Sequence, residues 1–215
     1  MTRSSSKPPS KWELGLFPGL SKDQLQDELT QYQHQHSRWG RILEYPAGAV
    51  LVEGGKIGGA REVTPLCNLI SFRSTWALSL GITLPSSGQK GLWAHYFYQN
   101  GMWSSPRRHP DDLAKQNQFR SVADTEAIAR AFSGTDPAVL EEYFHEDANI
   151  RIRLSQWASY MARRHRQKGW QPPEPPPIRR IRPEDRYLSN DWRLVFDLAR
   201  YLGFPIEGEL EASLK

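Results

Sequence analysis

The residues of this chain that could carry out chemistry are few and lie far apart in the sequence. The single cysteine, Cys67, lies among apolar residues, which favours a buried structural thiol over a reactive nucleophile. His34 and His36 are two positions apart, so on a helix their side chains point in different directions and cannot bind one metal ion together. The patterns G-x-S-x-G, H-E-x-x-H and C-x-x-C are absent from the sequence, which removes the well-marked hydrolase, metalloprotease and redox classes.

Two further clusters contain residue types that bind metals. His109, Asp111 and Asp112 come together at the start of a predicted helix, where the helix dipole by itself favours acidic residues. Residues 145–147 (His-Glu-Asp) fall between two predicted helices, where a solvated turn is expected. Neither cluster is joined by a second pair of ligands at a fixed spacing, so we expect no metal and no other cofactor.

The glycine-rich segment Gly54–Gly59 reads Gly-Gly-Lys-Ile-Gly-Gly and invites comparison with a phosphate-binding loop. A P-loop places a Lys-Ser/Thr pair at the start of a helix directly after its glycines. Here Lys56 lies between the glycine pairs, and the next predicted helix begins near Pro65, so we expect a connecting loop. If the chain is an enzyme of an unmarked class, the residues to test first are this loop together with Cys67, His95, His109 and Asp111.

The strongest positive signal is an uneven distribution of charge. The 215-residue chain has a net charge of +4, yet residues 151–186 contain ten lysines and arginines against three acidic residues, and the remainder carries −3. Guanidinium and indole groups suit an acidic protein surface, and equally phosphates and unstacked bases. Cations at the end of a helix also complement its dipole, so a solvated face is a third interpretation. The residues expected to bind a partner are Arg163, Arg164, Arg166, Lys168, Trp170, Arg179, Arg180 and Arg182.

These observations favour a non-enzymatic interaction or regulatory protein that binds an acidic macromolecular partner through a basic C-terminal face. The size and composition suit an accessory factor of a bacterial plasmid or phage, such as a conjugation (fertility) inhibitor. Nucleic-acid binding through the same stretch is the first alternative, although no familiar nucleic-acid-binding motif is present, and an enzyme of an unmarked class is the second. The single cysteine indicates a reducing compartment, the cytoplasm, and no apolar run is long enough to span a membrane.

The elements that must position these residues indicate an α+β fold. Short apolar runs around a Pro/Gly turn and around Asn100-Gly101 predict β-hairpins over residues 41–53 and 92–103. Because strands and helices are segregated, we expect one small antiparallel sheet and a helical C-terminal half. Over residues 64–81 a helix is expected, with a strand as the open alternative. The other predicted helices cover residues 21–39, 110 onward, 124–132, 136–144, 148–168 and 189–202.

We expect residues 13–205 to fold as one domain, with a disordered arm over residues 1–12 and an acidic tail over residues 206–215. Pro172–Pro177 predicts an extended polyproline segment inside a basic connector that covers residues 170–182. Only 38 residues follow the prolines, too few for an independent core. The last helix should therefore pack back on the main body.

Overall fold

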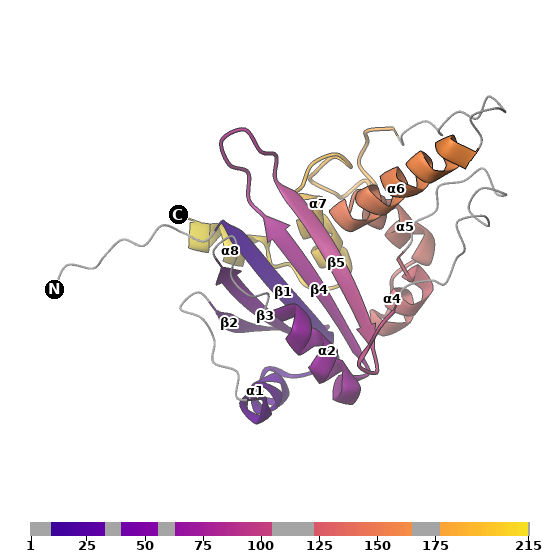
Figure 1. Cartoon of the computed structure of the whole chain (residues 1–215). Helices are drawn as coiled ribbons and strands as arrows, with labels where there is room; N and C mark the ends of the chain where they lie inside the picture. The colour runs from indigo at the N-terminus through magenta and orange to yellow at the C-terminus, as the bar shows by residue number, and fades with distance from the viewer. Residues whose placement is uncertain (1–9, 33–39, 56–62, 105–122, 165–176, 215) are drawn as a thin grey trace.

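An antiparallel sheet organises the chain (Figure 1). The computed structural model of the protein describes residues 10–32, 40–55, 63–104, 123–164 and 177–214. In this part of the chain six strands pair in the order β2-β3-β1-β4-β5-β6. The strands are β1 (Lys11–Pro18), β2 (Arg41–Tyr45), β3 (Gly48–Gly55), β4 (Trp76–Thr83), β5 (Leu92–Gln99) and β6 (Met102–Trp103).

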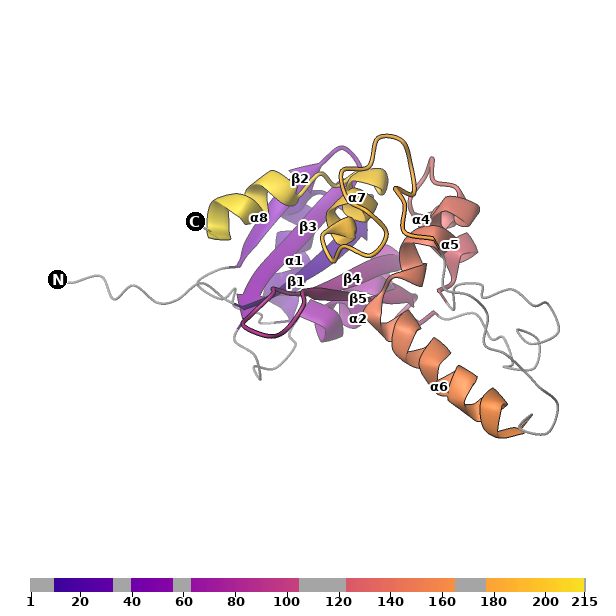
Figure 2. The ribbon, with the colours of Figure 1, turned by 90° about the horizontal axis from the view of Figure 1, so that it is seen from above.

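Helices lie on both faces of this sheet (Figure 2). Helices α1 and α2 cover one face, where Leu29 and Ile70 are fully buried. The opposite face is covered by helices of the C-terminal half, which bury Phe144 and Leu198. The predicted α+β fold with a helical C-terminal half is confirmed. The helices are α1 (Lys22–Gln31), α2 (Val63–Ser74), α4 (Thr125–Ala131), α5 (Pro137–His145), α6 (Ala148–Arg164), α7 (Leu194–Tyr201) and α8 (Glu207–Leu214).

Both predicted β-hairpins are confirmed. β2 pairs with β3 across Pro46 and Ala47, and β5 pairs with β6 across Asn100 and Gly101. The φ angles of Asn100 and Gly101 are 49° and 72°, as a type I′ turn requires at both central residues. Asn and Gly tolerate positive φ better than other residues, which is why this pair was a strong signal in the sequence.

Strand β1 was not predicted, although it lies inside the sheet between β3 and β4. It begins at Lys11, two residues inside the arm expected over residues 1–12, and the rest of that arm up to residue 9 lies outside the described residues. Alternate residues such as Leu14 and Leu16 are fully buried against the C-terminal helices. The strand gave no clear alternating signal because residues on both of its faces are buried.

The prediction of a helix over residues 64–81 is wrong for the second half of this range. Helix α2 ends at Ser74, Thr75 has a φ of 72°, and β4 begins at Trp76. The run from Trp76 to Thr83 contains mainly apolar residues that fit a pleated sheet as well as a helix. Pairing with β1 and β5 on both sides decides the outcome in favour of a strand.

Other predicted boundaries also shift. Helix α1 ends at Gln31 with Tyr32 as its C-cap, and residues 33–39 of the predicted helix lie outside the described residues. Helix α7 begins at Leu194 rather than near residue 189, and most of the expected acidic tail forms α8. The helix predicted from residue 110 lies outside the described residues. Helices α1, α4, α5 and α6 begin where the sequence placed them.

Candidate interaction surface

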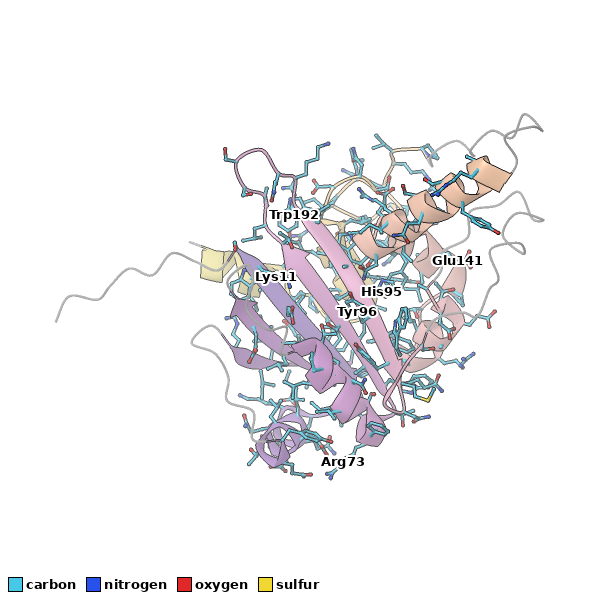
Figure 3. The ribbon with its side chains drawn as sticks, in the orientation of Figure 1. Lys11, Arg73, His95, Tyr96, Glu141 and Trp192 are labelled. Carbon is cyan, nitrogen blue, oxygen red and sulfur yellow. The ribbon has the colours of Figure 1, made fainter. Side chains whose placement is uncertain are left out.

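Helix α6 is fixed at its first turn by a buried pair of side chains. Asp147 is its N-cap residue: Oδ1 accepts a hydrogen bond of 3.0 Å from the Ile150 amide, and Oδ2 lies 2.7 Å from His95 Nδ1. Because a carboxylate can only accept, the Nδ1 atom of His95 carries the proton of this bond. The Asn149 side chain donates to the His95 carbonyl oxygen at 3.0 Å. Together these bonds join α6 to β5, the strand on which Figure 3 labels His95.

Beyond this turn, α6 stands away from the other described helices and the sheet (Figure 2). Ile152 and Tyr160 have exposed fractions of 56% and 50%, high values for large apolar and aromatic side chains. Exposed arginines, Arg151 and Arg163, lie near the two ends of the same helix. The helix therefore presents apolar, aromatic and cationic groups together.

The chain that returns after the proline-rich segment is held by a buried carboxylate, Asp185. The Tyr143 hydroxyl donates to both Asp185 oxygens at 2.6 and 2.7 Å, and the Arg182 amide donates to one of them at 2.9 Å. Burial, followed by the bond to Asp185, holds the pKa of Tyr143 well above its ordinary value, so the phenol keeps its proton.

A second buried carboxylate, Asp197 on α7, accepts from the amides of Arg186 and Tyr187 at 3.0 and 2.8 Å. The Arg200 guanidinium pairs with the other Asp197 oxygen at 2.5 Å. Two buried acids thus order residues 182–187, a segment that lies outside any helix or strand.

The predicted partner-binding residues fall into three groups. Arg179 and Arg182 make internal contacts, because Arg179 pairs with Glu142, and Arg182 pairs with Glu184 and lies over the Tyr201 ring at 4.3 Å. Arg163 and Arg180 are exposed and have no carboxylate partner among the described residues. Arg166, Lys168 and Trp170 lie outside the described residues. Arg164 is the last residue of α6, and its side chain is not described.

The internal ion pairs reduce the charge excess that the sequence suggested. Arg151 pairs with Glu146 at 2.5 Å and Arg186 with Glu207 at 2.8 Å, and both acids come from outside the basic stretch. The sequence count could not reveal these pairs because their partners lie in other elements. Because the arginine of each pair is exposed to solvent, each pair contributes on the order of 0–1 kcal/mol to stability.

The two enzyme candidates whose side chains the structure describes, Cys67 and His95, do not meet in one cleft. Cys67 lies in the core between the sheet and α1 and α2, whereas the His95 ring contacts Phe144 on the opposite face of the sheet, with ring centroids 4.3 Å apart. Burial, and secondarily the charge of Glu13, raises the pKa of Cys67, so the thiol stays protonated and is a poor nucleophile. His34, His36, His109, Asp111, Asp112 and residues 56–59 of the glycine-rich segment lie outside the described residues.

The remaining candidate cluster, residues 145–147, has structural partners rather than a metal geometry. Asp147 points inward as the cap of α6, and Glu146 pairs with Arg151. In the part of the chain that is described, no three His, Cys, Asp or Glu side chains gather as a metal site requires. An aspartate just before an apolar helix is a known start signal, so the cap of α6 could have been predicted. Its pairing with a histidine 52 positions away could not.

Comparison with known proteins adds no family to these observations. No protein-family model, curated protein or solved structure matches the chain. Among the described residues, no helix is both long enough and apolar enough to cross a membrane.

Proposed function

We propose that this chain is a cytoplasmic, non-enzymatic interaction protein that binds an acidic protein partner through α6 and the adjacent segment 177–182, here called the α6 surface. The observation that supports this most is the projection of α6 from the body with Ile152 and Tyr160 exposed on it. Large exposed side chains of this kind on a protruding element are typical of binding sites.

The two parts of the α6 surface adjoin at the start of the helix. Glu146, which pairs with Arg151, also lines a cavity of about 170 Å³ together with Pro177 and Arg179. Ile178 beside it has an exposed fraction of 62%. Apolar groups that become buried on binding supply free energy, while the surrounding cations select an acidic partner and speed its association.

The acidic character of the partner follows from the charges that stay available. Arg163 and Arg180 are exposed without a carboxylate neighbour among the described residues, and the pairs of Arg151 and Arg179 are exposed enough to exchange. For the biological setting we propose an accessory role in a plasmid or phage, such as inhibition of conjugation, which suits a small protein of this size and charge distribution.

The experiment that tests this function compares capture by two charge-reversal variants. The double variant Arg163→Glu/Arg180→Glu alters exposed cations of the α6 surface, while Arg130→Glu on α4 alters an exposed cation elsewhere. The tagged proteins are incubated with lysate of the organism that encodes the chain, with and without nuclease. A photo-crosslinker replaces Ser159 on α6 to report direct contact.

We expect one protein to crosslink at position 159, to survive nuclease and to be lost with the double variant but not with Arg130→Glu. Capture that disappears with nuclease and with moderate salt would instead identify the chain as a nucleic-acid binder. Equal capture by the double variant and the unmodified protein would refute the α6 surface as the binding site.

A further inference from the structure

A cavity of about 480 Å³ lies between the β4–β5 connection, the first turn of α6 and the turn that precedes α7. Its volume falls in the range of about 300–1,000 Å³ that small-molecule sites in proteins occupy. Its lining combines Trp93 and Trp192 with three cations, Lys90, Arg151 and Arg193. Two acids, Glu146 and Asp191, also line it, and each is paired with one of the arginines. Aromatic and cationic groups that face one hollow are the two features that a planar anion requires.

The Trp192 side chain, which lines the cavity, is closely packed against its neighbours. Trp192, labelled in Figure 3, packs directly on Gly91, where a Cβ atom would lie only 2.4 Å from the indole ring. Behind it, Phe196 supports the indole in an edge-on contact with ring centroids 5.9 Å apart. The glycine therefore admits the indole, and the phenyl ring holds it in place.

Trp93 carries an indole N–H that donates to no described residue. Its side chain is buried and lines the cavity, and the Nε1 atom has no hydrogen-bond partner among the described residues. A buried indole N–H without a partner costs free energy, so such groups normally find an acceptor. Because the Nε1 atom is covered by protein atoms, the Trp93 indole can report on the cavity but is not a contact for its ligand.

The cations differ in how they are held. The Arg193 guanidinium is bonded to Asp191 at 2.6 Å and lies over the Tyr187 ring at 4.5 Å, so its position is fixed. Arg151 is paired with Glu146. Lys90 alone of the three has no hydrogen bond or ion pair with any described residue, and it is exposed. A ligand anion can therefore reach Lys90 without displacing a carboxylate.

We propose that this cavity binds a small planar anion, with an aromatic or heteroaromatic ring against Trp192 and an anionic group at Lys90. The anionic group is either a phosphate, as on a nucleoside monophosphate, or a carboxylate, as on an aromatic acid. The proposal is independent of the α6 surface, because it requires no macromolecular partner.

The test follows the indole N–H signals of the full-length protein by NMR, with nitrogen-15 in the tryptophan side chains. Two probes carry both a ring and an anion: adenosine 5′-monophosphate and 2-naphthoate. Adenosine, which lacks the anion, and inorganic phosphate, which lacks the ring, are the matched controls. We expect one of the two probes to shift the Trp93 and Trp192 signals saturably, and the controls to bind at least about tenfold more weakly.

Substitutions in the lining of the cavity test whether the active probe binds there. Lys90→Met and Trp192→Ala should each weaken binding of the active probe by about tenfold or more, whereas Arg130→Met on α4 should leave it unchanged. Lys90 is exposed and has no bond to a described residue, so we expect its variant to fold even if Trp192→Ala does not. Absence of any saturable shift with both probes at about 10 mM would overturn the proposal, and so would binding that Lys90→Met leaves intact.

Discussion

His95 and Asp147 are 52 positions apart in the sequence, yet His95 Nδ1 and Asp147 Oδ2 are 2.7 Å apart in the core. The contact joins the edge of the sheet to the first turn of the helix that projects from it. Both side chains are buried, so the pair serves to hold α6 in place rather than to present chemistry to solvent.

The first prediction concerns this pair. Asp147→Ala removes the cap of α6 and leaves a buried histidine without its partner, so we expect a loss of about 2–4 kcal/mol in the free energy of unfolding. Asp136→Ala is the matched control, because Asp136 caps α5 through a bond of 2.8 Å to the Ala138 amide but is exposed. That control should lose only about 1 kcal/mol.

Urea denaturation measures both losses, and hydrogen exchange should show faster opening of the first turn of α6 in Asp147→Ala. If the two variants lose equal stability, the pairing with His95 contributes nothing and only the cap matters.

The second prediction concerns Tyr143 and Asp185. Tyr143→Phe removes the hydroxyl that donates to both oxygens of a buried carboxylate, so we expect a loss of about 1–3 kcal/mol. We also expect protease cleavage within residues 182–187 to become faster, because Asp185 orders this segment. Tyr32→Phe is the control: its hydroxyl makes a longer bond of 3.4 Å at the surface, and its loss should be within about 0.5 kcal/mol. Unchanged cleavage in Tyr143→Phe would contradict the assigned role.

The third prediction concerns alkaline pH. Burial, with smaller contributions from the charges of Cys67, Tyr96 and Glu13, raises the pKa of Tyr98 from 10.0 to about 12. The folded state therefore binds this proton more tightly than the unfolded chain. The resulting stability is fully present below pH 10 and is lost as the pH rises from 10 towards 12, at up to about 1.4 kcal/mol per pH unit.

Thermal melting between pH 7 and pH 12 measures this loss. Tyr98→Phe should reduce the slope above pH 10, while Tyr160→Phe on the exposed side of α6 should not. Tyr45, Tyr143 and Cys67 contribute to the slope that remains, because burial raises their pKa values as well. A slope that Tyr98→Phe leaves unaltered would show that the tyrosine is not responsible.

The fourth prediction concerns Gly91. Gly91→Ala places a methyl group within 2.4 Å of the Trp192 indole, so we expect the ring to be displaced at a cost of about 1–3 kcal/mol. Gly208→Ala in α8 is the opposite control: nothing lies within 4 Å of its Cβ position, and alanine in a helix should stabilise by up to about 1 kcal/mol.

Combining Gly91→Ala with Trp192→Leu should recover part of the lost stability, because the smaller side chain leaves room for the methyl group. Additive losses in the double variant, measured by urea denaturation, would rule out a direct clash as the cause.

Local sequence signals predicted the turns and helix starts that are formed by interactions within one short segment. Asn100-Gly101 specified its turn because both residues tolerate positive φ. Asp124 and Asp136 marked the starts of α4 and α5 because their side chains accept from amides two or three residues ahead. Such bonds lie within one short segment, so a single sequence contains all the information needed to recognise them.

Features formed by residues that are far apart in the chain could not be predicted from the sequence. β1 is a strand because β3 and β4 pair with it on both sides, and residues 76–83 became a strand for the same reason. The sequence places the excess charge within residues 151–186, but only the fold shows that Arg179 and Arg182 pair with carboxylates while Arg163 and Arg180 have no carboxylate partner among the described residues.

The sequence by itself determined the fold class, the two hairpins, four helix starts and the position of the excess charge, because each follows from residues that are neighbours in the chain. Tertiary structure alone decided the pairing of β1, the contacts of Tyr143 with Asp185 and of His95 with Asp147, and the cavity between Trp93 and Trp192. These require side chains from separate elements to meet, and no local pattern records which elements will pack together.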